Sequence, residues 1–153
     1  MNKQTSIAKI SKGDWQYLIP FFICVGTFIL TDIIIIINKA NYAYSSEYII
    51  IEPYRAISSH FLHLNFEHLL MNSGGILIAR YFLMRLELRN NIFFIILIAM
   101  LIPTQVIINY ILDIYTNTQY PAIGFSGILY GIDAFILLTS IYGKDKFLNL
   151  RVN

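Results

Sequence analysis

Long apolar runs alternate with short polar segments along the chain, and this pattern predicts a bundle of transmembrane helices. The runs lie at about 17–37, 66–86, 92–112 and 126–142. At 1.5 Å of rise per residue, about 20 apolar residues cross the hydrocarbon of a bilayer. The first three runs reach that length and the fourth is short. We therefore predict an all-α polytopic membrane protein with four transmembrane helices, the third of them bent at Pro103.

The polar segments divide the chain into two parts. Residues 1–14 form a polar N-terminal segment, and residues 15–153 form one membrane domain. The connection 38–64 is rich in tyrosine and poor in charge, which indicates a segment that lies at the membrane interface. A signal peptide is the alternative for the first run, but that run is longer than a signal h-region and no small-residue cleavage site follows it. We therefore expect a retained first span.

The composition agrees with a membrane protein and excludes some kinds of cysteine chemistry. Hydrophobic residues make up 57% of the chain and charged residues 13%, whereas soluble domains carry about 25% charged residues. The single cysteine, Cys24, lies inside the first apolar run. It can form neither an intrachain disulfide nor a metal site made of cysteines. We expect the lipid bilayer as a partner, and no nucleic acid, metal or cofactor.

The basic residues are distributed unequally across the predicted membrane. The side that carries both termini holds nine of them and the other side two; the nine are Lys3, Lys9, Lys12, Arg80, Arg85, Arg89, Lys144, Lys146 and Arg151, and the two are Lys39 and Arg55. The positive-inside rule then places both termini in the cytoplasm. We expect a multi-pass protein of a bacterial inner (plasma) membrane.

A serine flanked by glycines stands at the start of the fourth run. The sequence reads Gly124-Phe125-Ser126-Gly127, which places the Ser126 hydroxyl at a helix N-terminus, where backbone N–H groups are unpaired and the helix dipole favours negative charge. A nucleophilic serine and its oxyanion need this environment. A helix cap at Ser126 and close helix packing at the glycines are the structural alternatives.

All three histidines of the protein lie in one string that leads into the second run. His60 and His63 precede the run, and His68 and Asn72 share one helical face at its start. Three interpretations are open: hydrogen bonds between helices, donors to an oxyanion formed at Ser126, or a zinc site. Zinc is the weakest of them, because the spacings between the histidines do not place all three on one helical face.

These motifs together resemble the rhomboid family of intramembrane serine proteases. The similar features run from about residue 52 to 142 in the family's order: Arg55, His63, His68, Asn72, Gly124-Phe125-Ser126-Gly127 and Tyr130. The resemblance implies a serine endopeptidase that cleaves transmembrane protein substrates. It also implies a rhomboid-like helical bundle, of which this chain would have four transmembrane helices of the usual six.

The resemblance assigns roles to these residues. Ser126 would be the nucleophile, and His68 and Asn72 would support the oxyanion together with the backbone N–H of Ser126. Gly127 would allow the fourth span to pack closely. Tyr130, one turn after the serine, would stack against the catalytic base.

The interfacial connection carries two further residues of the family pattern. Arg55 and His63 would hold this connection in place. The chain reads Tyr54-Arg55 where the family usually has Trp-Arg, which is a mild change.

The serious departure from the family concerns the general base. Rhomboids have at least six spans and carry a histidine base on the sixth, whereas no histidine follows His68 here. A serine hydroxyl without a base is a poor nucleophile at neutral pH, and an oxyanion role for His68 conflicts with its use as the base. Either the domain is incomplete at its C-terminus, or the chain is an inactive relative that binds membrane helices. An unrelated four-span protein is the third hypothesis.

Two carboxylates fall within the apolar runs without an assigned role. Asp133 lies on the same helical stripe as Ser126, and Asp32 lies in the first run. A buried carboxylate is costly in a bilayer unless it is paired or protonated. Both possibilities stay open for each residue.

Overall fold

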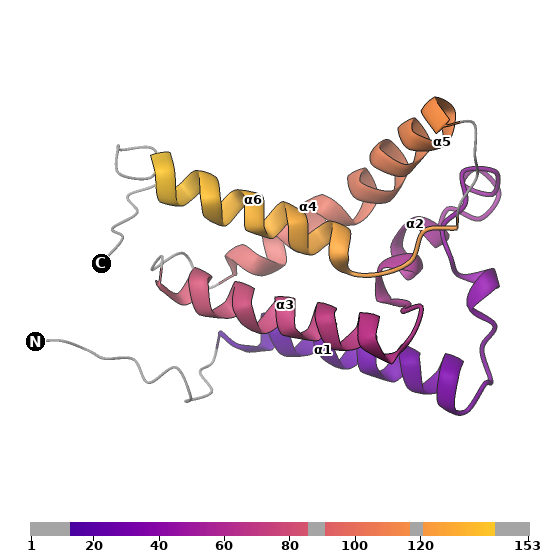
Figure 1. The fold of residues 1–153 in the computed structure, drawn as a ribbon, viewed down its shortest axis with the longest axis horizontal. Coiled ribbons are helices and arrows are strands. Elements are labelled where there is room, and N and C mark those ends of the chain that lie inside the picture. Colours follow the sequence, from indigo (N-terminus) through magenta and orange to yellow (C-terminus); the bar gives the residue numbers. More distant parts are fainter. Residues whose placement is uncertain (1–12, 86–90, 117–120, 143–153) are drawn as a thin grey trace, which may run out of the picture.

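The computed structural model describes residues 13–85, 91–116 and 121–142, and helices dominate this part of the chain (Figure 1). In order they are α1 (Trp15–Phe28), η1 (Ile29–Ile33), η2 (Lys39–Asn41), α2 (Arg55–Ser58), η3 (Ser59–Phe61), α3 (Phe66–Arg85), α4 (Ile92–Pro103), η4 (Thr104–Asn109), α5 (Tyr110–Thr116) and α6 (Ser126–Tyr142). The predicted all-α class is confirmed. Most of the predicted N-terminal segment 1–14 lies outside the described residues, as do residues 143–153.

Two of the helices are long and apolar enough to cross a membrane by length and composition. They are Trp15–Ile33, formed by α1 and η1, and Ile92–Thr116, formed by α4, η4 and α5. Helices α3 and α6 coincide closely with the second and fourth predicted spans. However, α6 is shorter than the other two, and α3 carries Glu67 and Arg80 within its length. The predicted count of four spans is therefore not confirmed.

The first helix ends earlier than the apolar run. Its π-helical end, η1, stops at Ile33, whereas the run continues to residue 37. Ile35 has a φ of 54°, and the N–H of Ile36 donates to the carbonyl of Leu30 at 3.0 Å. A β-branched residue rarely adopts this left-handed conformation, so a run of isoleucines does not predict where the helix ends.

The predicted bend at Pro103 corresponds to a change of helix type. Helix α4 ends at Pro103, the π-helix η4 follows it, and α5 continues from there. Proline has no N–H to donate, so one intrahelical hydrogen bond is lost at this point. The wider π turn follows directly after the proline.

The core lies between the long helices. Helix α6 packs against α3 and α4, and α1 packs against the same two helices. Ile128, Ile132 and Ile136 of α6 are buried, and their spacing of four residues places them on one face of the helix. The ring of Tyr17 in α1 packs on that of Phe93 in α4, with centroids 4.6 Å apart.

Glycines allow close contact on two sides of α6. A Cβ at Gly127 would overlap Cγ2 of Thr104 in η4. On the other side, a Cβ at Gly75 of α3 would lie 2.6 Å from Cδ1 of Leu129. Small residues at helix contacts let the backbones approach closely, so these two glycines set the position of α6 in the bundle.

An ion pair joins the start of α1 to the last part of α3. The Arg80 guanidinium donates from Nε to Oδ1 of Asp14 at 2.9 Å and from Nη2 to Oδ2 at 2.8 Å. Asp14 is buried. Helices α1 and α3 run in opposite directions, so the start of α1 lies beside the last part of α3 (Figure 1).

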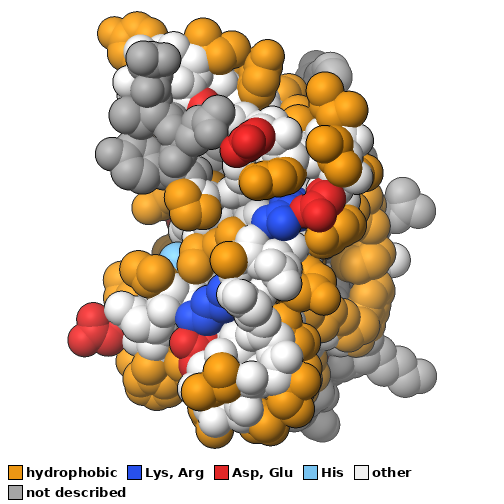
Figure 2. Space-filling model, turned by 90° about the vertical axis from the view of Figure 1, so that its right-hand side faces the viewer, with side chains coloured by type: hydrophobic (Ala, Val, Ile, Leu, Met, Phe, Trp, Pro, Cys, Tyr) orange, Lys and Arg blue, Asp and Glu red, His pale blue; other side chains and the backbone are white. Residues whose placement is uncertain are grey.

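Much of the outer surface is apolar. Figure 2 shows a face covered largely by apolar side chains, on which the few basic side chains lie beside acidic ones. Large exposed apolar residues occur on each of the long helices, for example Phe22, Met71, Ile98 and Leu137. Such a surface is typical of a protein surrounded by lipid.

The contact between Gly127 and Thr104 predicts an effect on stability. Gly127→Ala should lower the free energy of unfolding by about 1–3 kcal/mol, because the added methyl group overpacks a site closed by a buried β-branched side chain. The measurement is unfolding by dodecyl sulfate in mixed micelles, followed by circular dichroism. Gly74→Ala is the matched control, since a Cβ at Gly74 has no neighbour within 4 Å. Equal losses in the two variants would contradict the close contact.

Candidate active site

Backbone hydrogen bonds to the interfacial connection hold the segment that leads into α6. Tyr44 and Ala122 exchange N–H···O bonds of 3.0 and 3.1 Å, and the N–H of Gly124 donates to the carbonyl of Ser59 at 2.9 Å. Tyr44 and Ser59 are both fully buried. The approach of the chain to Ser126 is therefore fixed at two points.

Gly124 brings this segment against two polar residues of α3. Its φ is +118°, a conformation that side-chain-bearing residues rarely adopt. A Cβ at this position would lie 2.5 Å from Cε1 and 2.7 Å from Nε2 of His68, and 3.6 Å from Nδ2 of Asn72. Only glycine both adopts this φ readily and has no Cβ to clash with His68. The structure thus brings His68 and Asn72 together at a point two residues before Ser126.

Ser126 begins α6 and is half-buried. The carbonyl of Phe125, directly before it, accepts the N–H groups of Ile128 and Leu129 at 3.1 Å each. The helix therefore starts at this point, where its first N–H groups have no partner within the helix. The positive end of the helix dipole also lies at Ser126.

The side-chain amide of Asn72 is a buried donor without a partner. Asn72 is 4% exposed, and its Nδ2 makes no hydrogen bond to any of the described residues. A buried donor left unpaired costs about 1–3 kcal/mol. A negatively charged oxygen beside Gly124 could accept this N–H group.

The imidazole of His68 is held by two neighbours. The N–H of Leu64 donates to Nδ1 at 3.5 Å, and the ring of His63 packs edge to face at 5.3 Å between centroids. A neutral imidazole whose Nδ1 accepts a hydrogen bond carries its proton on Nε2. Because Nε2 lies next to Gly124, His68 is arranged as a hydrogen-bond donor at this point and not as a base.

The other two histidines are buried and bonded to main-chain carbonyls. Nδ1 of His63 donates to Phe61 at 3.2 Å, and Nε2 of His60 donates to Leu101 at 2.7 Å. Burial, together with the neighbouring His68, lowers the pKa of His63 to about 4, although the bond to Phe61 acts in the opposite direction. Burial also lowers the pKa of His60. Both rings are therefore neutral at pH 7.

The geometry offers neither a metal site nor an assigned base. In the described part of the chain, no three histidine, cysteine, aspartate or glutamate side chains come close enough to hold a metal ion. His60, His63 and His68 each use one nitrogen for a different main-chain partner. None of these contacts places an imidazole as a base for Ser126.

Arg55 ties the interfacial connection together. It is buried, and its Nη1 donates to the carbonyls of Ala40 at 2.5 Å and Ala43 at 3.2 Å. Its Nε pairs with Glu52, and its guanidinium lies 5.0 Å from the centre of the Tyr48 ring. These contacts join η2 and the residues directly after it to the start of α2.

The side of α6 that bears Tyr130 faces away from the bundle. Tyr130 is 73% exposed, and Asp133, one turn further on, is exposed as well. Tyr130 thus has no imidazole beside it that would correspond to the expected contact with a base. This face is not covered by any of the described helices.

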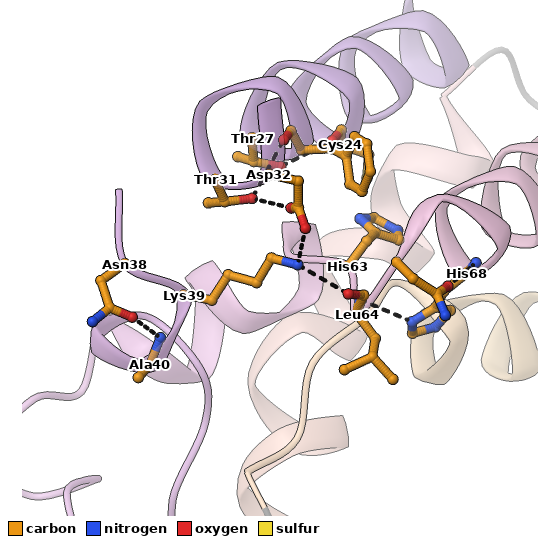
Figure 3. A network of polar contacts seen from close by, with 12 residues as sticks. Cys24, Thr27, Thr31, Asp32, Asn38, Lys39, Ala40, His63, Leu64 and His68 are labelled. Atoms are coloured by element: carbon orange, nitrogen blue, oxygen red, sulfur yellow. Dashed lines mark hydrogen bonds and ion pairs between the residues drawn. The ribbon is translucent and has the colours of Figure 1, made fainter. Parts of the chain in front are cut away.

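One contact of the site was not predicted from the sequence. Nζ of Lys39 lies 2.5 Å from Oδ1 of Asp32 and donates to the carbonyl of Leu64 at 3.0 Å (Figure 3). Lys39 stood out as one of two basic residues on its side of the membrane, and Asp32 as an acid in the first run. The opposite charges of these two residues could have suggested the ion pair between Lys39 and Asp32, whereas no feature of the sequence predicted the contact with Leu64.

The comparison with known families identifies the class of protein. The described part of the chain is all-helical, contains long apolar helices, and begins α6 at the half-buried Ser126. The family model described as Rhomboid domain matches residues 51–153, and the chain belongs to the rhomboid family. The predicted resemblance is confirmed. No curated protein and no solved structure gives a significant match to the chain.

The buried state of His63 predicts a dependence of stability on pH. The folded state keeps His63 neutral down to about pH 4, whereas the unfolded chain takes up a proton near the ordinary value of 6.5. The contribution of His63 is therefore full above pH 6.5 and is lost as the pH falls to 4, by about 3 kcal/mol. The measurement is the free energy of unfolding at pH 7 and pH 4.

His63→Gln provides the control, because it removes this titration and leaves that of His60. The variant should lose less stability between pH 7 and pH 4 than the parent protein does. An identical loss in the two proteins would show that His63 is not the group responsible.

Proposed function

We propose that this chain carries the nucleophile and the oxyanion site of a rhomboid-type intramembrane serine endopeptidase that cleaves transmembrane protein substrates. The observation that carries the proposal is the contact of His68 and Asn72 with Gly124, two residues before Ser126. The unpaired and buried Nδ2 of Asn72 supports it. Family membership alone supports only the coarser statement that the chain is a rhomboid protease or an inactive relative.

The mechanism follows from the donors at this point. Oγ of Ser126 gives its proton to the base and attacks the carbonyl carbon of the scissile peptide bond, whose oxygen becomes negatively charged; the C–N bond then breaks, and the amine leaves with the proton from the base. The N–H groups of Asn72 Nδ2, His68 Nε2 and the Ser126 backbone would bind this oxygen, aided by the dipole of α6. Donors that are in place before the reaction stabilise the transition state without reorganisation.

Other residues of the proposed site keep these groups in position. Arg55 secures the interfacial connection, His63 packs on the ring of His68, and Gly127 lets α6 approach η4. Tyr130, one turn after Ser126, would lie beside the base. We propose that the base is carried by an element that packs on the uncovered face of α6.

A second candidate function is that of an inactive rhomboid-like protein that binds membrane helices. The observation in its favour is that His68, the histidine next to Gly124, is arranged as a donor. In that case the uncovered face of α6 would contact a partner helix, and Ser126 would carry out no reaction.

We further propose four spans, formed by α1 with η1, by α3, by α4 to α5, and by α6, with both termini in the cytoplasm of a bacterial cell. The unequal distribution of basic residues supports this orientation. The opposite directions of α1 and α3, which bring Asp14 beside Arg80, agree with it.

The orientation can be tested by cysteine labelling in intact cells. In a Cys24→Ala background, Glu47→Cys should react with an impermeant maleimide, and Asn91→Cys should react only after permeabilisation. Both positions are exposed, so a lack of reaction does not result from burial. Labelling of Asn91→Cys in intact cells would contradict the arrangement.

The catalytic proposal can be tested with a serine-directed phosphonate probe. The chain alone should be nearly inert, because none of the described side chains is placed as a base for Ser126. Addition of the last two spans of a related rhomboid, as a separate piece, should restore labelling. In the restored protein Asn72→Ala should lower kcat on the order of 10²-fold, as expected for the loss of one oxyanion donor.

Ser126→Ala should abolish the label, and Ser73→Ala is the matched control, since Ser73 lies on α3 directly after Asn72. Persistence of the label in Ser126→Ala would rule out Ser126 as the nucleophile. Failure of the restored protein to react at all would favour the inactive relative.

A further inference from the structure

An ion pair closes the turn that follows the first helix. Oδ1 of Asp32, in η1, lies 2.5 Å from Nζ of Lys39, the first residue of η2. The hydroxyl of Thr31 donates to Oδ2 of the same carboxylate at 2.6 Å. The carboxylate therefore has a partner on each oxygen, which fixes the direction of the Lys39 side chain (Figure 3).

Lys39 extends this contact to the connection before α3. Its Nζ donates to the carbonyl of Leu64 at 3.0 Å, and the N–H of Leu64 donates to Nδ1 of His68 at 3.5 Å. The side chain of Leu64 is 67% exposed and so gives the residue little anchorage in the core. The buried His63 anchors the chain directly before Leu64, and among the described polar contacts of the Leu64 backbone, the bond from Lys39 is the one that comes from outside α3 and its connection.

The bond from Leu64 determines which nitrogen of His68 carries the proton. A neutral imidazole has one donor and one acceptor nitrogen, and the hydrogen bond made by one of them decides the state of the other. With Nδ1 accepting from Leu64, Nε2 is the donor, and Nε2 is the nitrogen next to Gly124. If Leu64 moved away, the proton could shift to Nδ1, and the group beside Gly124 would become an acceptor.

We propose that Asp32 and Lys39 are positioning residues for His68: through Leu64 they hold the imidazole as the tautomer that presents an N–H group at Gly124. Their importance for catalysis rests on the proposed function, since the donor serves an oxyanion only if Ser126 is the nucleophile. The state of the His68 ring itself does not depend on that function. The ion pair also explains how Asp32 is tolerated at the end of an apolar run.

The test measures the tautomer directly. The chain, labelled with ¹⁵N-histidine and held in detergent micelles, contains three histidines, and His68→Gln assigns the signals of His68. The wild-type ring should show a protonated Nε2 and an unprotonated Nδ1 at pH 8. In Lys39→Met the Nδ1–H form of His68 should rise severalfold, while Lys39→Arg should keep the wild-type pattern.

Arg80→Met is the matched control. It breaks an ion pair of α1 at the opposite end of the helix, so it removes comparable charge without touching Leu64, and its His68 signals should be unchanged. If Lys39→Met does not fold, Asp32→Asn loosens Lys39 with almost no change of shape, and it should shift His68 in the same direction.

Three results would overturn the proposal. One is a wild-type His68 protonated on Nδ1, the second is an unchanged tautomer in the folded Lys39 or Asp32 variants, and the third is an equal change in Arg80→Met. A phosphonate-inert Ser126 with a His68 that responds to Lys39 would leave this inference standing and overturn only the catalytic proposal. A Ser126 that reacts with the phosphonate, together with a His68 that does not respond to Lys39, would overturn this inference alone.

Discussion

The contact of Gly124 with His68 and Asn72 is the constraint on which the site depends. A φ of +118° and a distance of 2.5 Å from a would-be Cβ to His68 leave room only for hydrogen. The N–H of Gly124 is bound to Ser59, so the segment cannot move away without losing a buried hydrogen bond. Because Ser126 follows two residues later as the first residue of α6, one contact sets the distance between the serine and the donors of α3.

A neutral His63 suits the buried surrounding of the site. A charged ring at His63 would face the ring of His68 at 5.3 Å, and both burial and that neighbour oppose the charge. Nδ1 of His68 accepts from the N–H of Leu64, and its Nε2 lies next to Gly124. His63 thus packs against His68 without adding a buried charge, which would be costly in a low dielectric.

The apolar runs predicted the helix boundaries most accurately where a sequence motif marks the end of the run. Helix α3 begins at Phe66 and α6 at Ser126, as expected from the motifs at their starts. The end of the first helix was missed because Ile35 adopts a conformation that isoleucine rarely takes. Family motifs predicted His68, Asn72 and Ser126 as site residues, and the structure places them near one another, whereas Ser59 and Leu64 make their contacts through backbone groups. Every residue has a backbone carbonyl, and nearly every residue has a backbone N–H, so no sequence pattern reveals which of these groups form hydrogen bonds with each other.

One face of α6 is not covered by any of the described helices. Exposed leucines suit lipid, but the phenol of Tyr130 and the carboxylate of Asp133 do not, since polar groups in a bilayer need partners. Asp32 illustrates the solution within this chain, because Lys39 and Thr31 occupy both of its oxygens. Tyr130 and Asp133 follow Ser126 at helical spacing. An element that supplied partners to these two residues would therefore also lie over Ser126, so under the proposed function the contact that stabilises α6 in the membrane would also complete the active site.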